Sequence, residues 1–193
     1  MQTYLIYTLI AAVILLVVTL YCVGIYNTLI LFQNNTKQSF ANIDVLLVQR
    51  HDELPKLVET CKQYMGFEQK TLVDVMDARS KAYQARQSGD IKAMGAAEGA
   101  LQTGLGALMA TVENYPDLKA NEDFQKLQER ITGLETDIAE KRSDYNDTAK
   151  RYNVQIAQFP PVIVARMCNF KEADLLHFDK ATTSDVDLKG MFA

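Results

Sequence analysis

Two charged side chains, Arg79 and Glu98, fall on the apolar stripes of two predicted helices. Each is in phase with apolar residues spaced three and four apart, which is the spacing of one helix face. The two residues lie ten and nine positions from Gly89, a turn signal between the stretches. An antiparallel hairpin would therefore place them opposite each other, and we predict a partly buried, structural ion pair that fixes helix register. A catalytic or ligand-binding role is the alternative.

The other residues that could do chemistry are scattered along the chain. His51 and His177 are its two histidines, neither has a second histidine at metal-ligand spacing, and we expect His51 in a solvated loop. Glu68 is a lone carboxylate. The sequence contains no Gly-rich phosphate loop, nucleophile elbow or paired-cysteine motif. We therefore predict no catalytic residue, no cofactor-binding residue and no metal site, and we expect that the protein is not an enzyme.

The three cysteines, Cys22, Cys61 and Cys168, are odd in number and widely spaced. This pattern is not a disulfide framework. Reduced, buried thiols are expected, and a Cys61–Cys168 disulfide is the weaker alternative. The net charge of −4 and the pI of about 5.2 argue against a nucleic-acid partner.

The longest apolar stretch, residues 4–32, contains no charged side chain. About 20 apolar residues are enough for a helix to cross a bilayer, so residues 1–25 are predicted to be an uncleaved transmembrane anchor. Tyr4 and Tyr26 are the expected anchors at the two membrane interfaces.

Three basic residues, Lys37, Arg50 and Lys56, follow the span, whereas no charged side chain precedes it. The positive-inside rule then places the rest of the chain in the cytoplasm, with the periplasm as the alternative. We predict a helical bundle domain over residues 26–179 and a flexible tail over residues 180–193.

Helical periodicity continues beyond the span to Leu47, so the membrane helix is expected to run on as one rod that ends near Arg50. The sequence HDELP over residues 51–55 is interpreted as a break, because Pro55 suits a first helical turn. Further helices are predicted over residues 54–87, 91–115 and 122–158.

A seven-residue spacing of Tyr145, Tyr152 and Phe159 on one stripe predicts left-handed, coiled-coil-like packing. The fold class is therefore all-α: an N-terminal transmembrane helix continuous with a long antiparallel four-helix bundle of up-down-up-down topology. The apolar segment over residues 162–170 is left open as a strand, a short helix or an interface segment.

The connection over residues 114–121 reads as a loop, and Asn121 is expected to cap the next helix. It is strongly patterned yet carries no catalytic set, which makes it a candidate interaction loop with the residues Tyr115, Pro116, Asp117, Leu118 and Lys119.

Several of these segments together resemble the LemA family of bacterial membrane proteins. The resemblance rests on YNTLILFQN at 26–34, the long segment at 40–64, ENYPDLKANEDFQKLQERI at 113–131, RSDYNDTAKRYNVQIAQFP at 142–160 and NFKEAD at 169–174. Phe40 stands where the family commonly has Trp. The resemblance implies an N-terminal anchor in the bacterial inner membrane, a helical bundle and no established enzymatic activity. For some relatives it implies membrane remodelling in magnetosome-forming cells.

Two functions fit these observations. The first is a single-pass, membrane-anchored scaffold that assembles into a homo-oligomer through the Ala- and Gly-rich faces of the helix over residues 91–115. The second is an adaptor that binds another membrane protein, a protease or a signalling component, through its membrane-distal loops. Membrane lipid is a partner in both.

Overall fold

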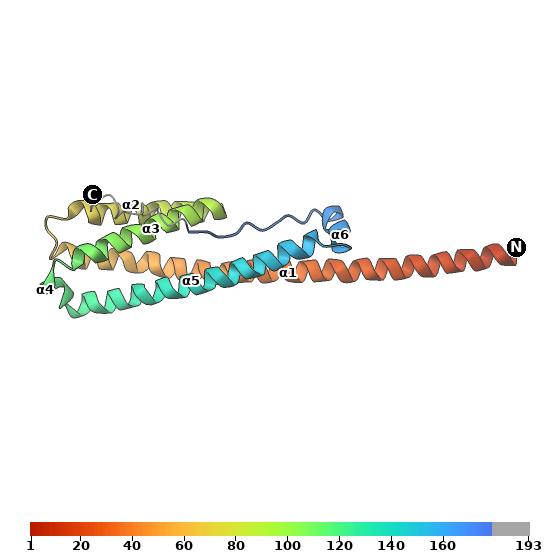
Figure 1. Cartoon of the computed structure of the whole chain (residues 1–193), viewed down its shortest axis with the longest axis horizontal. Coiled ribbons are helices and arrows are strands. Elements are labelled where there is room, and N and C mark those ends of the chain that lie inside the picture. Colours follow the sequence, from red (N-terminus) through yellow and green to blue (C-terminus); the bar gives the residue numbers. More distant parts are fainter. Residues whose placement is uncertain (179–193) are drawn as a thin grey trace, which may run out of the picture. The chain divides into compact units, whose positions relative to one another are not determined.

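A computed structural model describes residues 1–178, which form six helices and no strand (Figure 1). The helices are α1 (Gln2–Lys62), α2 (Gln69–Ser88), α3 (Ile91–Val112), α4 (Pro116–Lys119), α5 (Glu122–Ala157) and α6 (Pro161–Met167). The all-α prediction is confirmed for this part of the chain. The predicted tail over 180–193 lies outside the described residues.

Helix α1 does not break at residues 51–55; it continues through Pro55 to Lys62. The predicted end near Arg50 was wrong because the apolar phase does not stop there. Residues spaced three and four apart stay buried across the proline, and these are Leu47, Arg50, Leu54, Leu57 and Cys61. Packing of this face outweighs the local preference of proline for a helix start.

The first part of α1 has no protein neighbours that bury it. Every residue from 1 to 24 is exposed, although nearly all of them are apolar. Among the described residues, α1 is the one helix long and apolar enough to cross a membrane. These properties together suit a helix whose surroundings are lipid.

Contacts divide the chain into two compact units. The first unit combines residues 1–40 with residues 144–173, and so contains the apolar part of α1, the end of α5 and α6. Its small core brings these three helices together through the buried residues Leu29, Tyr152, Ile156, Val164 and Ala165.

The segment left open by the sequence is the short helix α6, and its end is closed by hydrogen bonds typical of a Schellman motif. Asn169 adopts the left-handed conformation with φ 56°. The N–H of Phe170 then donates to the carbonyl of Ala165 at 2.9 Å, and that of Asn169 donates to the carbonyl of Arg166 at 3.3 Å. This motif fixes the path of residues 169–173.

The same residues are held to α5 by side-chain hydrogen bonds. Tyr152 donates its hydroxyl to the carbonyl of Lys171 at 2.9 Å, and Asn153 exchanges two hydrogen bonds with the backbone of Ala173, at 2.9 and 2.8 Å. Burial raises the pKa of the Tyr152 hydroxyl. The segment after α6 is therefore a fixed part of the first unit.

The second unit contains residues 41–143 together with the chain from residue 174 onward. Here the second part of α1 packs with α2, α3 and the first part of α5 in alternating directions, as predicted for an up-down-up-down bundle. Its core is apolar and includes Leu54, Val75, Leu101, Leu108, Phe124 and Ile131.

The α2–α3 turn has the predicted capping residues. Gly89 has φ 71°, in the left-handed region where glycine is favoured, and ends α2. The carboxylate of Asp90 accepts hydrogen bonds from the backbone N–H groups of Lys92 and Ala93 at 2.9 and 3.0 Å and begins α3.

Two other expectations change in the structure. The segment over 114–121 contains the short helix α4, whose Leu118 is fully buried in the core, while Asn121 caps α5 by accepting from the N–H of Phe124 at 2.9 Å. Phe159 is 80% exposed, so it does not belong to the core stripe of α5. Helix α5 ends at Ala157, and this turns the next residues away from the stripe.

Two glycines of α3 differ in their surroundings, and we predict opposite effects for the same substitution. A Cβ at Gly95 would collide with the backbone carbonyl of His177, whereas a Cβ at Gly106 would meet nothing within 4 Å. Gly95→Ala should lower the free energy of unfolding by about 1–3 kcal/mol, as overpacking does. Gly106→Ala should raise it by about 0.5–1 kcal/mol. Urea unfolding of the detergent-solubilised protein, followed by circular dichroism, measures both. Equal stabilisation by both substitutions would contradict the close contact at Gly95.

Candidate functional site

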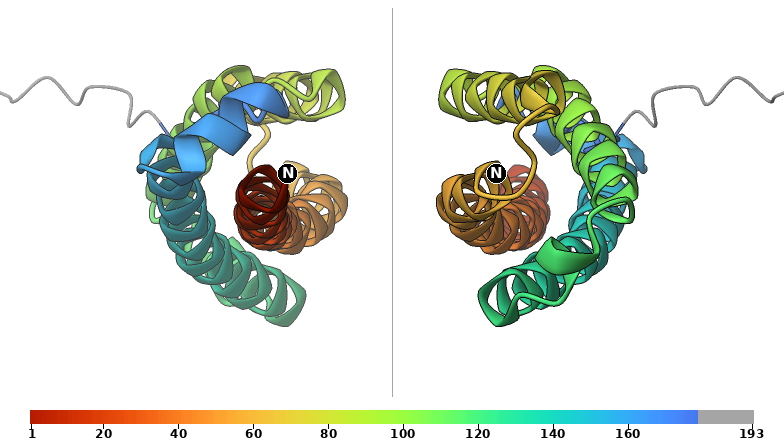
Figure 2. Two further views of the ribbon diagram at one scale, coloured as in Figure 1. Left: turned by 90° about the vertical axis from the view of Figure 1, so that its right-hand side faces the viewer. Right: turned by 90° about the vertical axis from the view of Figure 1, so that its left-hand side faces the viewer.

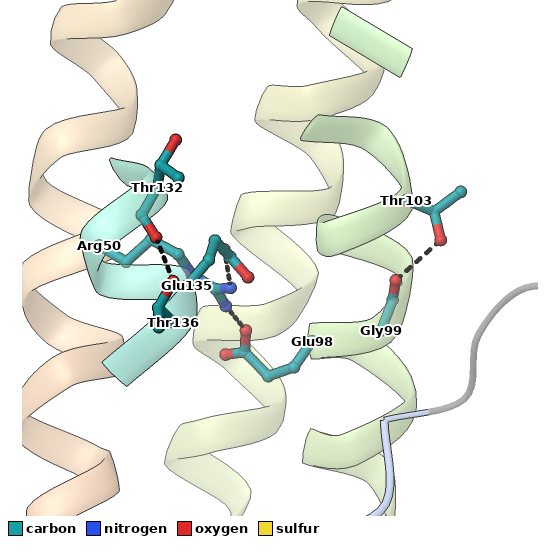
Figure 3. Close-up of polar contacts among 7 residues, drawn as sticks. All are labelled: Arg50, Glu98, Gly99, Thr103, Thr132, Glu135 and Thr136. Atoms are coloured by element: carbon teal, nitrogen blue, oxygen red, sulfur yellow. Dashed lines mark hydrogen bonds and ion pairs between the residues drawn. The ribbon is translucent and has the colours of Figure 1, made fainter. Parts of the chain in front are cut away.

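The most unusual polar feature of the second unit is a buried arginine in helix α1. Arg50 is 1% exposed and lies between two carboxylates from other helices, Glu98 of α3 and Glu135 of α5 (Figure 3). One terminal nitrogen of its guanidinium donates to Glu98, and the other donates to Glu135 at 2.5 Å. A single side chain thus links three helices of the unit.

Glu98 is the carboxylate predicted to pair with Arg79, and the structure corrects its partner. Glu98 is 3% exposed and pairs with Arg50. The prediction treated α2 and α3 as the whole environment, but α1 also packs against α3 and presents its arginine there. Burial of this pair offers little net stability over apolar packing, yet removing one partner would strand a buried charge, which typically costs about 3–5 kcal/mol.

Arg79 instead compensates for the proline in α1. A proline has no N–H, so Pro55 cannot donate to the carbonyl of His51, the residue four positions earlier. The Nε–H of Arg79 donates to that carbonyl at 2.9 Å. The hydrogen bond missing from α1 is thus replaced by a side chain from α2, which satisfies a partly buried acceptor.

The imidazole of His51 lies between Arg79 and Tyr83 of α2. Its ring stacks on Tyr83 with centroids 4.8 Å apart, and its Nδ1 lies 3.1 Å from a terminal nitrogen of Arg79. Because a guanidinium can only donate, Nδ1 must accept here, which requires a neutral ring. His51 is therefore packed against a second helix rather than lying in a solvated loop.

The pKa of His51 is lowered from its ordinary value of 6.5. Burial is the largest cause and the positive charge of Arg79 the next, with a smaller contribution from Arg86 in the same direction. Asp52, whose carboxylate lies 3.4 Å from Nδ1, acts in the opposite direction but does not cancel them.

A second arginine of α2 makes a two-point ion pair with α1. Arg86 donates from Nε to one oxygen of Asp44 at 2.5 Å and from a terminal nitrogen to the other oxygen at 3.0 Å. This pairing raises the pKa of Arg86. Geometry of this kind fixes orientation as well as charge, because the planar guanidinium matches the carboxylate.

Arg50, His51, Arg79, Arg86 and Glu98 line a cavity of about 310 Å³ between α1, α2 and α3. Of its two carboxylates, Glu98 accepts from Arg50, and Asp52 is exposed with an oxygen 3.4 Å from Nδ1 of His51. Among the described residues, no group of three potential ligands is arranged to hold a metal ion. The cluster is suited to cross-linking helices by charge.

The other residues singled out from the sequence lie apart from this cluster. Tyr4 and Tyr26 are exposed on α1, and Tyr26 contacts the ring of Phe170. Of the candidate interaction loop, Pro116, Asp117 and Lys119 are exposed, Tyr115 is half-buried and Leu118 is core.

All three cysteines are free thiols in the described part of the chain. Cys61 is buried, and burial raises the pKa of its thiol to about 11, so it is protonated and unreactive at neutral pH. Cys22 and Cys168 are exposed, so the expected burial of Cys168 was wrong: it follows the last residue of α6, outside the core.

Sequence reasoning missed four members of the charged cluster: Asp44, Arg50, Arg86 and Glu135. For Arg50 a signal existed, since it continues the apolar phase of α1 between Leu47 and Leu54. Glu135 gave no signal, because it lies beside the core stripe of α5 rather than on it.

Comparison with known sequences agrees with this architecture. The sequence model of the LemA family matches residues 39–189, most of the chain. The chain belongs to the LemA family. This LemA-family protein is 25% identical to magnetosome protein MamQ 2 of Paramagnetospirillum magneticum, an alignment that covers 84% of this chain and 68% of the relative.

Two further relatives have similar levels of identity. Magnetosome protein MamQ of Magnetospirillum gryphiswaldense is 24% identical over 79% of this chain and 64% of its own length. Protein LemA of Metamycoplasma hominis is 26% identical over 86% of this chain and 74% of its own length. Together with the apolar part of α1, these matches indicate a membrane-associated protein.

The replacement of a helix hydrogen bond by Arg79 predicts energetic coupling to Pro55. Arg79→Met should destabilise the native protein by about 1–3 kcal/mol, because the carbonyl of His51 loses its donor. In a Pro55→Ala background, the new backbone N–H can bond that carbonyl, so the same substitution should cost less. A double-mutant cycle from urea unfolding measures the difference. Arg86→Met is the matched control, and its effect should be equal in both backgrounds. Additive effects of Arg79→Met and Pro55→Ala would contradict the pairing.

The lowered pKa of His51 predicts a loss of stability at mildly acidic pH. As pH falls below about 6.5, the unfolded chain takes up a proton on His51 before the folded chain does, which favours unfolding. The loss should continue until pH reaches the lower folded-state pKa. The free energy of unfolding is measured from pH 8 to pH 5 for the unsubstituted protein and for His51→Gln. The curve for His51→Gln should lack the part of the acid loss that His51 causes. The control His177→Gln should keep it, and an unchanged curve for His51→Gln would argue against a neutral, buried imidazole.

Proposed function

We propose that this protein is a non-enzymatic scaffold, anchored in the bacterial inner membrane by α1, that assembles into a homo-oligomer. One observation supports self-assembly: α3 has an exposed face made of small residues. They recur every three or four positions along the helix, and they are Ala93, Ala96, Ala100, Thr103, Ala107 and Ala110.

Such a face has the properties of a helix-packing surface. It lies opposite the buried stripe of α3, which includes Met94, Leu101 and Leu108, so the bundle itself does not use it. Small side chains allow another helix to approach closely, and this face carries no charged side chain to oppose association. If the same contact repeats between copies until it closes, the product is a ring.

Helix α1 supports the membrane part of the proposal. Its exposed apolar residues and its bundle residues belong to one uninterrupted helix of 61 residues. The basic residues after the span favour a cytoplasmic location for the bundle. The similarity to magnetosome proteins fits a role in organising membrane, which we extend to this chain as part of the proposal.

A second candidate, an adaptor for another membrane protein, is favoured by a different surface. Phe67, in the α1–α2 connection, is 99% exposed. Next to it lies a groove of about 530 Å³ whose apolar lining includes Val58, Met65, Leu72 and Met76. An apolar segment of another protein would fit there, and this location replaces the 114–121 loop, whose Leu118 is core.

One experiment separates the two candidates. The mass of the detergent-solubilised protein at micromolar concentration should be a multiple of the chain mass, measured by light scattering after size-exclusion chromatography. Ala100→Lys with Ala107→Lys should reduce it to the monomer without changing the helical circular dichroism, because the charges fall within the small-residue face.

The matched control is Gln102→Lys, an exposed position of α3 away from that face, which should leave the oligomer intact. A protein that is monomeric before any substitution would overturn the scaffold proposal. Recovery from membranes of one stoichiometric partner, lost in Phe67→Ser, would then favour the adaptor.

A further inference from the structure

Three large apolar side chains are exposed together around α6. Ile163 is 51% exposed and Met167 81%, and they lie four residues apart on α6; Phe159, in the turn before α6, is 80% exposed. The opposite side of α6 is buried through Pro161, Val164 and Ala165. The helix is therefore apolar on both sides, with one side used by the first unit and the other unpartnered.

Contacts within the first unit place α6 at the end of the apolar span. Val164 and Ala165 pack in one core with Leu29, and Ile25 lies against that core. The ring of Phe170 lies 5.9 Å from that of Tyr26, in an edge-to-face arrangement. Tyr26 directly follows the predicted membrane anchor, residues 1–25, and is the predicted headgroup-level anchor. Helix α6 is thus at the level where α1 would leave the bilayer.

The direction of α6 also suits that level. Within the first unit, α6 lies across α1 rather than along it (Figure 2). A helix across the spanning helix runs along the membrane plane, so one of its sides can face the acyl chains. The Schellman motif at Asn169 and the hydrogen bonds of residues 171 and 173 to α5 keep it there.

The polar groups beside the stripe favour an anionic surface. Arg166 and Lys171 are exposed and form no ion pair among the described residues, while Glu172 is the acidic neighbour. Lipid phosphates at headgroup level would provide partners for the two cations, as they do for basic residues of interfacial helices.

We propose that α6 is an interfacial helix that inserts Phe159, Ile163 and Met167 into the surface of the same phospholipid bilayer that α1 crosses. The proposal rests on the membrane anchoring in the proposed function, but it does not depend on self-assembly. The position of α6 beside Ile25 and Tyr26, where the predicted anchor ends, is the reason to name lipid, rather than a second protein, as the occupant.

The absence of tryptophan from the sequence makes a direct test simple. Single substitutions Phe159→Trp, Ile163→Trp and Met167→Trp in the full-length protein each introduce one fluorescent reporter. The protein is reconstituted in nanodiscs of phosphatidylcholine and phosphatidylglycerol, with bromine at a shallow or a deep position of the acyl chains. All three variants should show blue-shifted emission, and shallow bromines should quench them more strongly than deep ones.

Two matched variants report the anchor and the water-exposed bundle. Leu15→Trp, in the middle of the uncharged stretch, should be quenched most by deep bromines. Val45→Trp, 56% exposed in the second unit, should not be quenched. If Leu15→Trp is quenched while the three α6 variants behave like Val45→Trp, anchoring holds and the α6 proposal fails.

The remaining outcomes also decide the matter. An unquenched Leu15→Trp would overturn the anchoring and the α6 proposal together. A third outcome is blue-shifted emission from the α6 variants that brominated lipid does not quench and that depends on the number of protein copies per nanodisc. It would show that a second copy covers the stripe. That result would overturn lipid as the occupant.

Discussion

Helix α1 has to remain helical through a proline while its surroundings change from exposed apolar positions to a packed bundle. Proline removes one backbone hydrogen bond and crowds the preceding turn, at a typical cost of about 3 kcal/mol. Two features offset this cost. The apolar face of α1 stays in phase from Leu47 to Cys61, and Arg79 donates to the carbonyl that Pro55 cannot reach. Because α1 contributes to the cores of both compact units, the rest of the fold depends on this continuity.

The charged cluster around Arg50 follows from the same continuity. Once α1 passes residue 50 as a helix, Arg50 must point into the bundle, and a buried guanidinium requires acceptors. Glu98 and Glu135 provide them from two other helices. Apolar residues of similar size would pack there with comparable stability, so the cluster is better understood as a constraint on helix rotation and axial position. Arg86 with Asp44 applies a second constraint between α1 and α2.

Surfaces left unused by these cores carry the functional proposals. The small-residue face of α3 carries no charge and makes no core contact, and α6 lies beside Ile25, where the predicted anchor of α1 ends. One surface is suited to another helix, because its side chains are small. The other is suited to acyl chains, because its side chains are large and apolar. The two proposals thus name different partners because the two apolar surfaces differ in side-chain size and position.

Much of this fold was present in the sequence as local information. Periodicity predicted the helices, Gly89 with Asp90 and Asn121 predicted their ends, and an uncharged run of residues predicted the membrane-suited part of α1. These signals are local because each depends on residues within a few turns of one another. The break at Pro55 was predicted wrongly, since the local preference of proline was weighed without the packing that overrides it.

The partners of the charged side chains were decided only by the tertiary structure. Arg79 and Glu98 lie at similar distances from the α2–α3 turn, yet they do not pair with each other. Glu98 pairs with Arg50 of α1, and Arg79 donates to the carbonyl of His51 in α1. Likewise, Phe159 keeps the seven-residue spacing of the α5 stripe but leaves the core, because α5 ends at Ala157. Spacing along one helix determines which side chains share a face. Which neighbour that face meets depends on the rotation and axial shift of helices packed from distant parts of the chain.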